Sequence, residues 1–113
     1  MARYDSLPVF KASYDLLVNI FRFSSNFARE YKYTVGEKLK NETLQLIVLV
    51  YRANSSRSKV EIIQEAREQV ELIRVLIRLM HELKQINIKS FVNINKQIES
   101  VSKQLTGWQK SQK

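Results

Sequence analysis

Residues 59–84, KVEIIQEAREQVELIRVLIRLMHELK, carry the most regular hydrophobic pattern in the chain. Apolar side chains recur there three and four residues apart, a spacing that puts them on one face of an α-helix. The positions are Ile63, Ala66, Val70, Ile73, Ile77 and Met80. A second apolar flank adds Ile62, Leu72, Leu76, Leu79 and Leu83. The stretch therefore predicts a long amphipathic helix whose inner face belongs to a hydrophobic core.

Three other segments have the same kind of pattern. Together they predict four helices near residues 8–31, 35–53, 59–84 and 91–110. The first opens at Pro8, whose missing N–H is harmless at a helix start. Its expected inner face is Phe10, Tyr14, Leu17, Phe21, Ser24, Ala28 and Tyr31, with Phe27 widening the stripe. The expected inner face of the second is Leu39, Thr43, Leu46, Val50 and Ala53, and that of the fourth is Phe91, Ile94, Ile98, Val101, Leu105 and Trp108.

Polar residues mark where these helices begin. Thr34 with Glu37, and Ser58 with Glu61, have the spacing of a capping box. In that motif the two side chains accept hydrogen bonds from each other's backbone N–H groups. Ser90 is expected to cap the fourth helix. These signals place the helix starts next to Val35, Lys59 and Phe91.

The length and the helix pattern define the fold class. The chain has 113 residues, the size of one ordinary domain. Four amphipathic helices joined by short loops predict an all-α, antiparallel, up-down-up-down four-helix bundle over residues 1–113. We expect tails only at residues 1–6 and 111–113. Residues 44–51 are apolar on nearly every side, so the second helix is expected to meet another subunit as well, in a homo-oligomer.

The sequence lacks the residues that most enzymes and metal sites use. There is no cysteine, and the one histidine, His81, has no Glu-x-x-His partner of the kind that builds metal sites in bundles. The two glycines, Gly36 and Gly107, form no phosphate-binding loop. We therefore expect neither catalysis nor a cofactor. His81 is expected on the surface beside Arg78, and Trp108 as an anchor in the core or an interface rather than a platform for stacked bases.

The chain also lacks membrane and export signals. No run of about 18 apolar residues is present, so no segment is expected to span a membrane. The first ten residues, MARYDSLPVF, contain no apolar signal core. We expect a cytoplasmic protein.

Basic residues outnumber acidic ones, with 19 Lys and Arg against 11 Asp and Glu and a net charge of +8. Residues 32–57 and 90–113 hold six of these eight excess charges. The fourth helix has a lysine every seven residues, at Lys89, Lys96, Lys103 and Lys110. Seven residues are about two helical turns, so these ammonium groups form a row, and Glu99 is the only acid in that helix. Such a row is either a solvated face or a surface that binds a polyanion.

Other basic residues join the candidate site. One stripe of the third helix holds Arg67, Arg74, Arg78 and His81. Glu71 lies one helical turn from Arg67 and from Arg74, so partial ion pairing is expected there. The full set of candidate nucleic-acid-binding residues is Lys38, Lys40, Arg52, Arg57, Arg67, Arg74, Arg78, Lys89, Lys96, Lys103 and Lys110. No base-reading motif is visible, so the expected contacts are with phosphates and with shape.

Three strings of residues resemble a known family. They are LPVFKASYDLL at 7–17, REYKYTVGEKLKNETLQLIVLVYRANSS at 29–56, and LTGWQKS at 105–111. The sequence is similar to the four-helix-bundle proteins that include Avd, the accessory variability determinant of diversity-generating retroelements. Proteins encoded by intervening sequences in bacterial 23S ribosomal RNA genes belong to the same group. Relatives often carry a proline after the residue that matches Phe27, and Ala28 here is expected to let the first helix continue to Tyr31.

The resemblance implies a basic, pentameric, barrel-like ring of four-helix protomers without enzymatic activity. It implies an accessory role, in which the protein binds RNA and a reverse transcriptase. DNA stays open as an alternative ligand of the basic residues. The alternatives that stay open are a protein of the ribosomal intervening-sequence type and a stand-alone scaffold that binds only proteins.

Overall fold

The pattern of residues 59–84 forms helix α4, Lys59–Glu82, in the computed structural model, which describes residues 3–112. The six expected core positions are all buried, with exposed fractions of 0 or 1%. The expected inner faces of the second and fourth helices are buried in the same way, apart from Phe91 and Trp108, which are half-buried and pack against the core. The three-four spacing therefore identified the core side of three of the four long helices.

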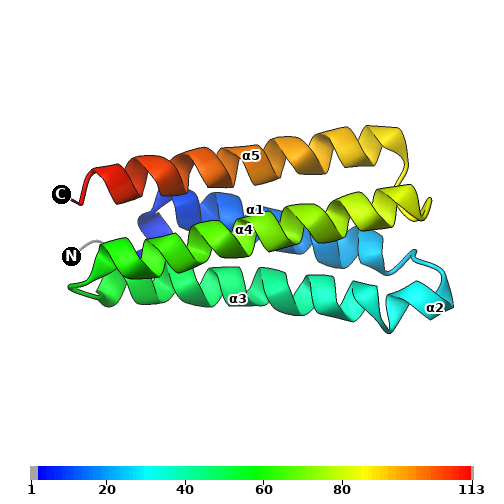
Figure 1. Ribbon diagram of the computed structural model, residues 1–113, viewed down its shortest axis with the longest axis horizontal. Coiled ribbons are helices and arrows are strands. Elements are labelled where there is room, and N and C mark those ends of the chain that lie inside the picture. Colours follow the sequence, from blue (N-terminus) through cyan, green and yellow to red (C-terminus); the bar gives the residue numbers. More distant parts are fainter. Residues whose placement is uncertain (1–2, 113) are drawn as a thin grey trace.

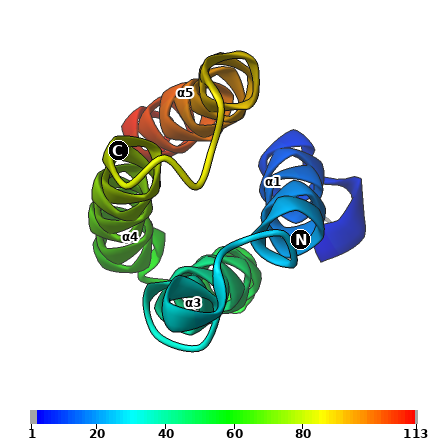
Figure 2. The same cartoon turned by 90° about the vertical axis from the view of Figure 1, so that its right-hand side faces the viewer.

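The other elements complete a bundle around α4. They are the 3-10 turn η1 (Tyr4–Ser6) and the helices α1 (Pro8–Ser24), α2 (Arg29–Lys32), α3 (Val35–Ser55) and α5 (Ile88–Lys110). Figure 1 shows that each long helix runs antiparallel to the next along the chain. Seen end-on, α1, α3, α4 and α5 occupy four corners in that order, so α3 lies opposite α5 (Figure 2). The all-α prediction is confirmed, because the described residues contain no strand.

The first helix is shorter than the sequence predicted. It ends at Ser24 and the chain turns before α2, so the expected continuous helix to Tyr31 is wrong. The turn inserts Phe27 into the core, where its exposed fraction is 4%. It also lets the backbone N–H of Ala28 donate to Oε1 of Gln85, 2.7 Å away in the α4–α5 connection. Both interactions join segments far apart in sequence, and a continuous helix would lose them.

Helix α1 also turns a different face inward. Its buried residues are Val9, Ser13, Leu16, Ile20 and Ser24, of which only Ser24 was predicted. From the predicted stripe, Phe10 and Tyr31 are partly buried against the core. The rings of Tyr14 and Phe21 are 51% and 43% exposed. Two adjacent stripes compete on this helix, and the one with small and aliphatic side chains fits the centre of a narrow bundle. The aromatic stripe is left beside α3 and in solvent.

The helix starts lie close to the predicted positions, but the predicted caps do not form. Neither Thr34 nor Ser58 accepts a backbone N–H with its side chain. The Thr34 hydroxyl donates instead to the carbonyl oxygen of Glu30, 2.7 Å away. Helix α5 begins at Ile88, earlier than predicted, because the side chain of Asn87 accepts the N–H of Ser90 at 2.8 Å. Asn87 therefore caps this helix, and the prediction that Ser90 does so is wrong.

The N-terminal segment is more ordered than the sequence predicted, whereas the last helix ends at Lys110 as predicted. Part of the expected tail over residues 1–6 forms η1, and the ring of Tyr4 packs edge-on against Phe10 and Tyr51 with centroids 5.0 Å apart in both pairs. Residues 1–2 and 113 lie outside the described range. Within that range, no helix is long and apolar enough to cross a membrane.

Candidate nucleic-acid interface

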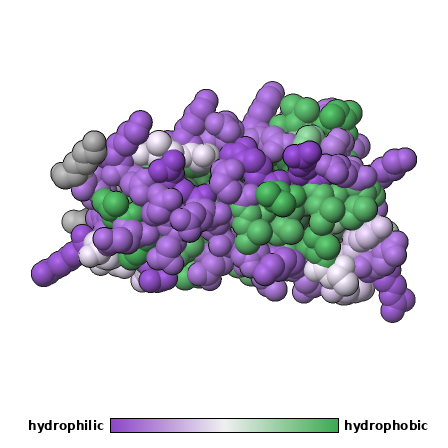
Figure 3. All heavy atoms as spheres, in the orientation of Figure 1, coloured by the Kyte–Doolittle hydropathy of each residue, from purple (hydrophilic) through white to green (hydrophobic). Residues whose placement is uncertain are grey.

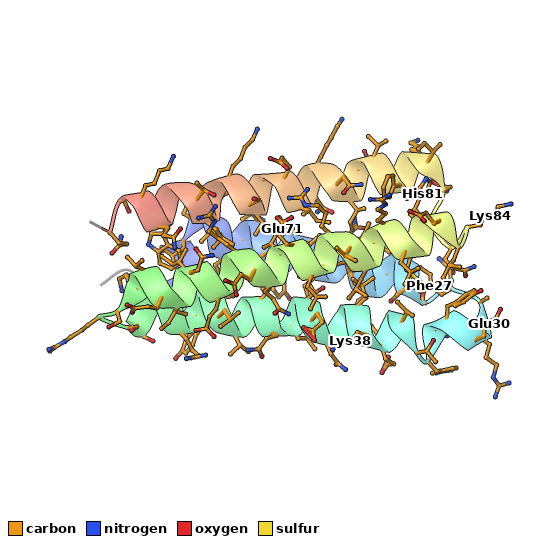
Figure 4. All side chains as sticks on the ribbon, in the orientation of Figure 1. Phe27, Glu30, Lys38, Glu71, His81 and Lys84 are labelled. Atoms are coloured by element: carbon orange, nitrogen blue, oxygen red, sulfur yellow. The ribbon has the colours of Figure 1, made fainter. Side chains whose placement is uncertain are left out.

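Helix α5 presents its lysines on the side that faces away from the bundle. The inner side is anchored by the buried residues Ile94, Ile98, Val101 and Leu105. The opposite side carries the exposed residues Lys89, Lys96, Lys103 and Lys110, here called the lysine ridge. Figure 4 shows long side chains projecting from this side of α5. At about 1.5 Å per residue the ridge extends over ~31 Å. The predicted row is therefore one continuous exposed surface.

One acid lies near the ridge, Glu99, which is one helical turn from Lys96 and from Lys103. The only acid in α5 is Glu99, and its Oε2 lies 3.4 Å from Nη1 of Arg74 on α4. Arg74 also pairs with Glu71, with 3.3 Å between Nε and Oε1. Among the described residues, the four ridge ammonium groups take part in no ion pair or hydrogen bond. The four ammonium groups are unpaired and face solvent.

The basic residues of α4 mostly connect helices. Nη1 of Arg67 donates to Oε1 of Gln109 on α5, 2.6 Å away. The expected ion pair with Glu71 is therefore found for Arg74, and Arg74 also contacts Glu99 on α5. Arg67 instead donates to Gln109. Arg78 pairs with Glu82 at 2.8 Å, but its side chain is 76% exposed. Of the three arginines, only Arg78 is open enough to help the ridge hold a ligand.

His81 is not the surface residue that the sequence predicted. Its ring is half-buried and stacks on Phe91, with centroids 4.0 Å apart and planes 10° from parallel. Its Nδ1 lies 3.0 Å from the carbonyl oxygen of Ile86. The prediction is wrong because the chain folds back after α4 and brings the start of α5 against this ring (Figure 4).

The predicted basic residues of the second helix lie on α3 and at its end, at the corner of the bundle opposite α5 (Figure 2). They are Lys38, Lys40, Arg52 and Arg57. Lys38 pairs with Glu42 at 3.0 Å. Lys40 pairs with Glu37 at 2.6 Å. Arg52 and Arg57 are exposed and have no partner among the described residues. Within one protomer these groups do not join the lysine ridge.

Glu42 belongs to the packing of α3 against α4. The side chain of Gln69 on α4 donates to a carboxylate oxygen of Glu42 and also to its backbone carbonyl oxygen. The hydrogen bond from Gln69, followed by that from Lys38, lowers the pKa of Glu42 from its ordinary 4.5, although partial burial opposes the shift. The charged form of Glu42 is therefore part of the folded structure.

A hollow beside the ridge was not predicted from the sequence. It has a volume of about 300 Å³ and lies between the start of α1 and the end of α5. Its lining residues are Leu7, Pro8, Val9, Gln104, Gly107 and Trp108. Trp108 packs against the core, as expected, and also lines this hollow. A glycine inside a helical pattern next to a tryptophan was the only signal for it in the sequence.

The described residues hold no group of three or more His, Asp or Glu side chains placed to bind a metal ion. The surface offers ammonium groups and neutral amides, which bind anions and form hydrogen bonds. The structure is thus an all-α four-helix bundle with an exposed basic ridge. A model of the bAvd-like family matches residues 9–112, and the chain belongs to this family. No curated protein matches the chain.

Proposed function

We propose that this protein is a non-catalytic, oligomeric accessory factor that binds nucleic acid through the lysine ridge. The observation that carries the proposal is the ridge itself, four exposed ammonium groups with no internal partner. Membership of the bAvd-like family supports an accessory role. In that role the protein binds RNA, with DNA as an alternative ligand, and presents it to a partner reverse transcriptase in the cytoplasm.

The geometry of the ridge suits a phosphate backbone. Successive lysines are about 10 Å apart along the helix axis. Each step drifts ~20° around the axis, because seven residues fall short of two full turns. A gently winding line of point charges can follow a sugar-phosphate chain, and each neutralised phosphate releases counterions. Binding of this kind is strong at low salt and needs no particular base sequence.

Two separate apolar surfaces support assembly of several copies. The α1–α3 surface consists of Tyr14, Phe21, Leu44, Val48 and Tyr51, each 42–51% exposed. The α4 surface consists of Leu72, Val75 and Leu79, which are 38%, 62% and 39% exposed. Figure 3 shows a hydrophobic area over the half of the bundle where the C-terminal part of α4 runs. A solitary protomer would leave both surfaces in water.

Charged residues of both signs lie beside the two surfaces, among them Asp15 next to Tyr14 and Arg78 next to Leu79. Arg22 lines a hollow within the α1–α3 surface, and Arg52 neighbours Tyr51 at its edge. The exposed acids Glu65 and Glu68 precede the α4 surface on the same helix. The proposal pairs the α1–α3 surface of one copy with the α4 surface of the next, so that both are covered. Contacts between unlike surfaces close into rings or continue as filaments, and the pentamer implied by the family is a closed ring.

Binding is tested by comparing two double variants that lose the same charge. Lys96→Gln with Lys103→Gln removes half of the lysine ridge, and Arg29→Gln with Arg57→Gln removes two exposed cations that belong neither to the ridge nor to the two apolar surfaces. Fluorescence anisotropy with a structured RNA at low salt is expected to show roughly tenfold or greater weakening for the ridge variant. The control variant is expected to lose much less. Equal losses would mean that total charge, and not the ridge, attracts the RNA. No binding by the wild type would favour the scaffold that binds only proteins.

Assembly is tested by light scattering at micromolar concentration. The wild type is expected to be a homo-oligomer, and Val75→Glu is expected to dissociate it. Val75 is 62% exposed within the protomer, so the new carboxylate is harmless to the fold and is buried only in the assembly. A monomeric wild type, or an unchanged mass for Val75→Glu, would contradict the proposed contact.

A further inference from the structure

The hollow at the end of the lysine ridge is lined by a glycine, Gly107, that packing within the protomer does not explain. Gly107 lies inside α5, and the helix continues to Lys110. Its φ is not positive, so it is not the left-handed glycine that ends many helices. A Cβ built on it would meet nothing within 4 Å. Glycine in a helix is roughly 1 kcal/mol less stable than alanine, and here no internal contact requires it.

What glycine does provide is open backbone beside an aromatic ring. Gly107 and Trp108 both line the hollow, and Pro8 and Val9 of α1 lie across from them. This hollow, from here on called the recess, is apolar and has a volume of about 300 Å³. That volume is at the lower end of the range for sites that hold small organic groups. A flat ring entering it would contact the indole and approach the α5 backbone.

Gly107, at the edge of the recess, lies between two ridge lysines along α5. Lys103 precedes Gly107 by four residues and Lys110 follows it by three, so all three residues share one exposed stripe of α5. Along the helix axis the two lysines are about 6 Å and 4.5 Å from the glycine. Anionic groups on either side of an inserted ring would therefore meet an ammonium group.

Gln104 adds a hydrogen-bonding group to the recess. Its Nε2 lies 3.0 Å from the Ser100 hydroxyl oxygen, while its Oε1 has no hydrogen-bond partner among the described residues. That oxygen is buried, and Gln104 is one of the residues that line the recess. A buried acceptor without a hydrogen-bond donor costs free energy, so a hydrogen bond from a ligand N–H to this oxygen would recover that cost.

We propose that this recess binds one unpaired base of a single-stranded nucleic acid whose phosphates lie on the lysine ridge. The base stacks beside Trp108 over Gly107, Gln104 accepts an N–H from its edge, and Lys103 and Lys110 contact the flanking phosphates. This inference rests on the proposed function and deepens it, because the lysine ridge alone recognises only the phosphate charges of a nucleic acid and not its bases. It assigns the protein a preference for unpaired, base-bearing strands over duplex.

The test compares a short oligoadenylate with an abasic ribose-phosphate oligomer of the same length. Trp108 is the only tryptophan, so its fluorescence reports directly on the recess. We expect the oligoadenylate to quench Trp108 and to bind roughly 5- to 20-fold more tightly than the abasic oligomer, as stacking of one base produces. We expect both oligomers to respond to salt.

Two leucine variants separate the recess from the ridge. Gly107→Leu adds a branched side chain at the edge of the recess, where its Cβ meets nothing within 4 Å, and is expected to abolish both the quenching and the preference while retaining abasic binding. Asn93→Leu is the matched control, because exposed Asn93 lies between Lys89 and Lys96 at the same spacing, and it should retain both. Equal affinities of the wild type for the two oligomers would overturn the inference and leave the proposed function standing. Absence of binding to either oligomer would overturn both.

Discussion

Replacing each of the two helix glycines with alanine is predicted to change stability in opposite directions. In a helix interior, alanine is about 0.5–1 kcal/mol more stable than glycine. At Gly107 the added Cβ meets nothing within 4 Å, so Gly107→Ala should gain that amount. At Gly36 the Cβ would come within 2.9 Å of the carbonyl oxygen of Tyr31 and 3.2 Å of Cδ2 of Phe27.

The contacts at Gly36 cannot relax cheaply. The Tyr31 oxygen is backbone in α2, and Phe27 is fixed in the core with 4% of its surface exposed. Overpacking of this kind destabilises proteins by about 1–3 kcal/mol, which exceeds the gain in helix propensity. We expect Gly36→Ala to lower the free energy of unfolding by a net ~0.5–2 kcal/mol.

The assay is urea unfolding followed by far-UV circular dichroism. All variants must be compared at one protein concentration, because assembly makes stability depend on concentration. The midpoint for Gly107→Ala should rise and that for Gly36→Ala should fall, with unchanged slopes. Stabilisation of both variants would show that the α1–α3 turn is not packed as described. Destabilisation by Gly107→Ala would show that Gly107 has a structural role, and would weaken the case for the recess.

Three further changes follow from individual contacts. Ile98→Ala removes a fully buried side chain and should lower the free energy of unfolding by about 2–5 kcal/mol in the same urea assay. Lys59→Met removes an ammonium group that donates to three carbonyl oxygens at the end of α3 at 2.7–3.1 Å, so thermal unfolding should show a loss of about 1–3 kcal/mol. Because the pKa of Glu42 is lowered in the folded state, its stabilising contribution is present above pH 4.5 and is lost as pH falls through the folded value. Urea midpoints measured across that acid range should therefore fall less for Glu42→Gln than for the wild type, and an identical fall would contradict the role of Gln69 and Lys38.

Sequence periodicity predicted the core sides of α3, α4 and α5 because each has one dominant apolar stripe. It failed on α1, where an aromatic stripe through Tyr14 and Phe21 lies next to a stripe that includes Ser13 and Leu16. Counting hydrophobic residues favours the aromatic stripe, but the centre of the bundle takes the smaller side chains. The exposed aromatic stripe then becomes surface available to another copy.

The remaining differences depend on contacts between distant segments. The turn after α1 is fixed by Ala28 binding Gln85 and by Phe27 packing beneath Gly36, and local propensity contains neither contact. The exposed lysine ridge was predictable, because it needs only the helical period. The recess was not, because it requires the start of α1 to lie against the end of α5. The separation of the α3 cations from the ridge likewise follows from the order of helices around the bundle.

The most direct test of the central claim is the salt dependence of RNA binding by the wild type and by the Lys96→Gln, Lys103→Gln double variant. A ligand that contacts four to six cations predicts a slope of roughly −3 to −5 in a plot of log affinity against log salt concentration. Loss of two ridge lysines should make the slope shallower by about 1.5. Both lysines are exposed and unpaired, so the circular dichroism spectrum should not change. Identical slopes for the two proteins, or no binding at low salt, would show that the ridge is only a solvated face of the bundle.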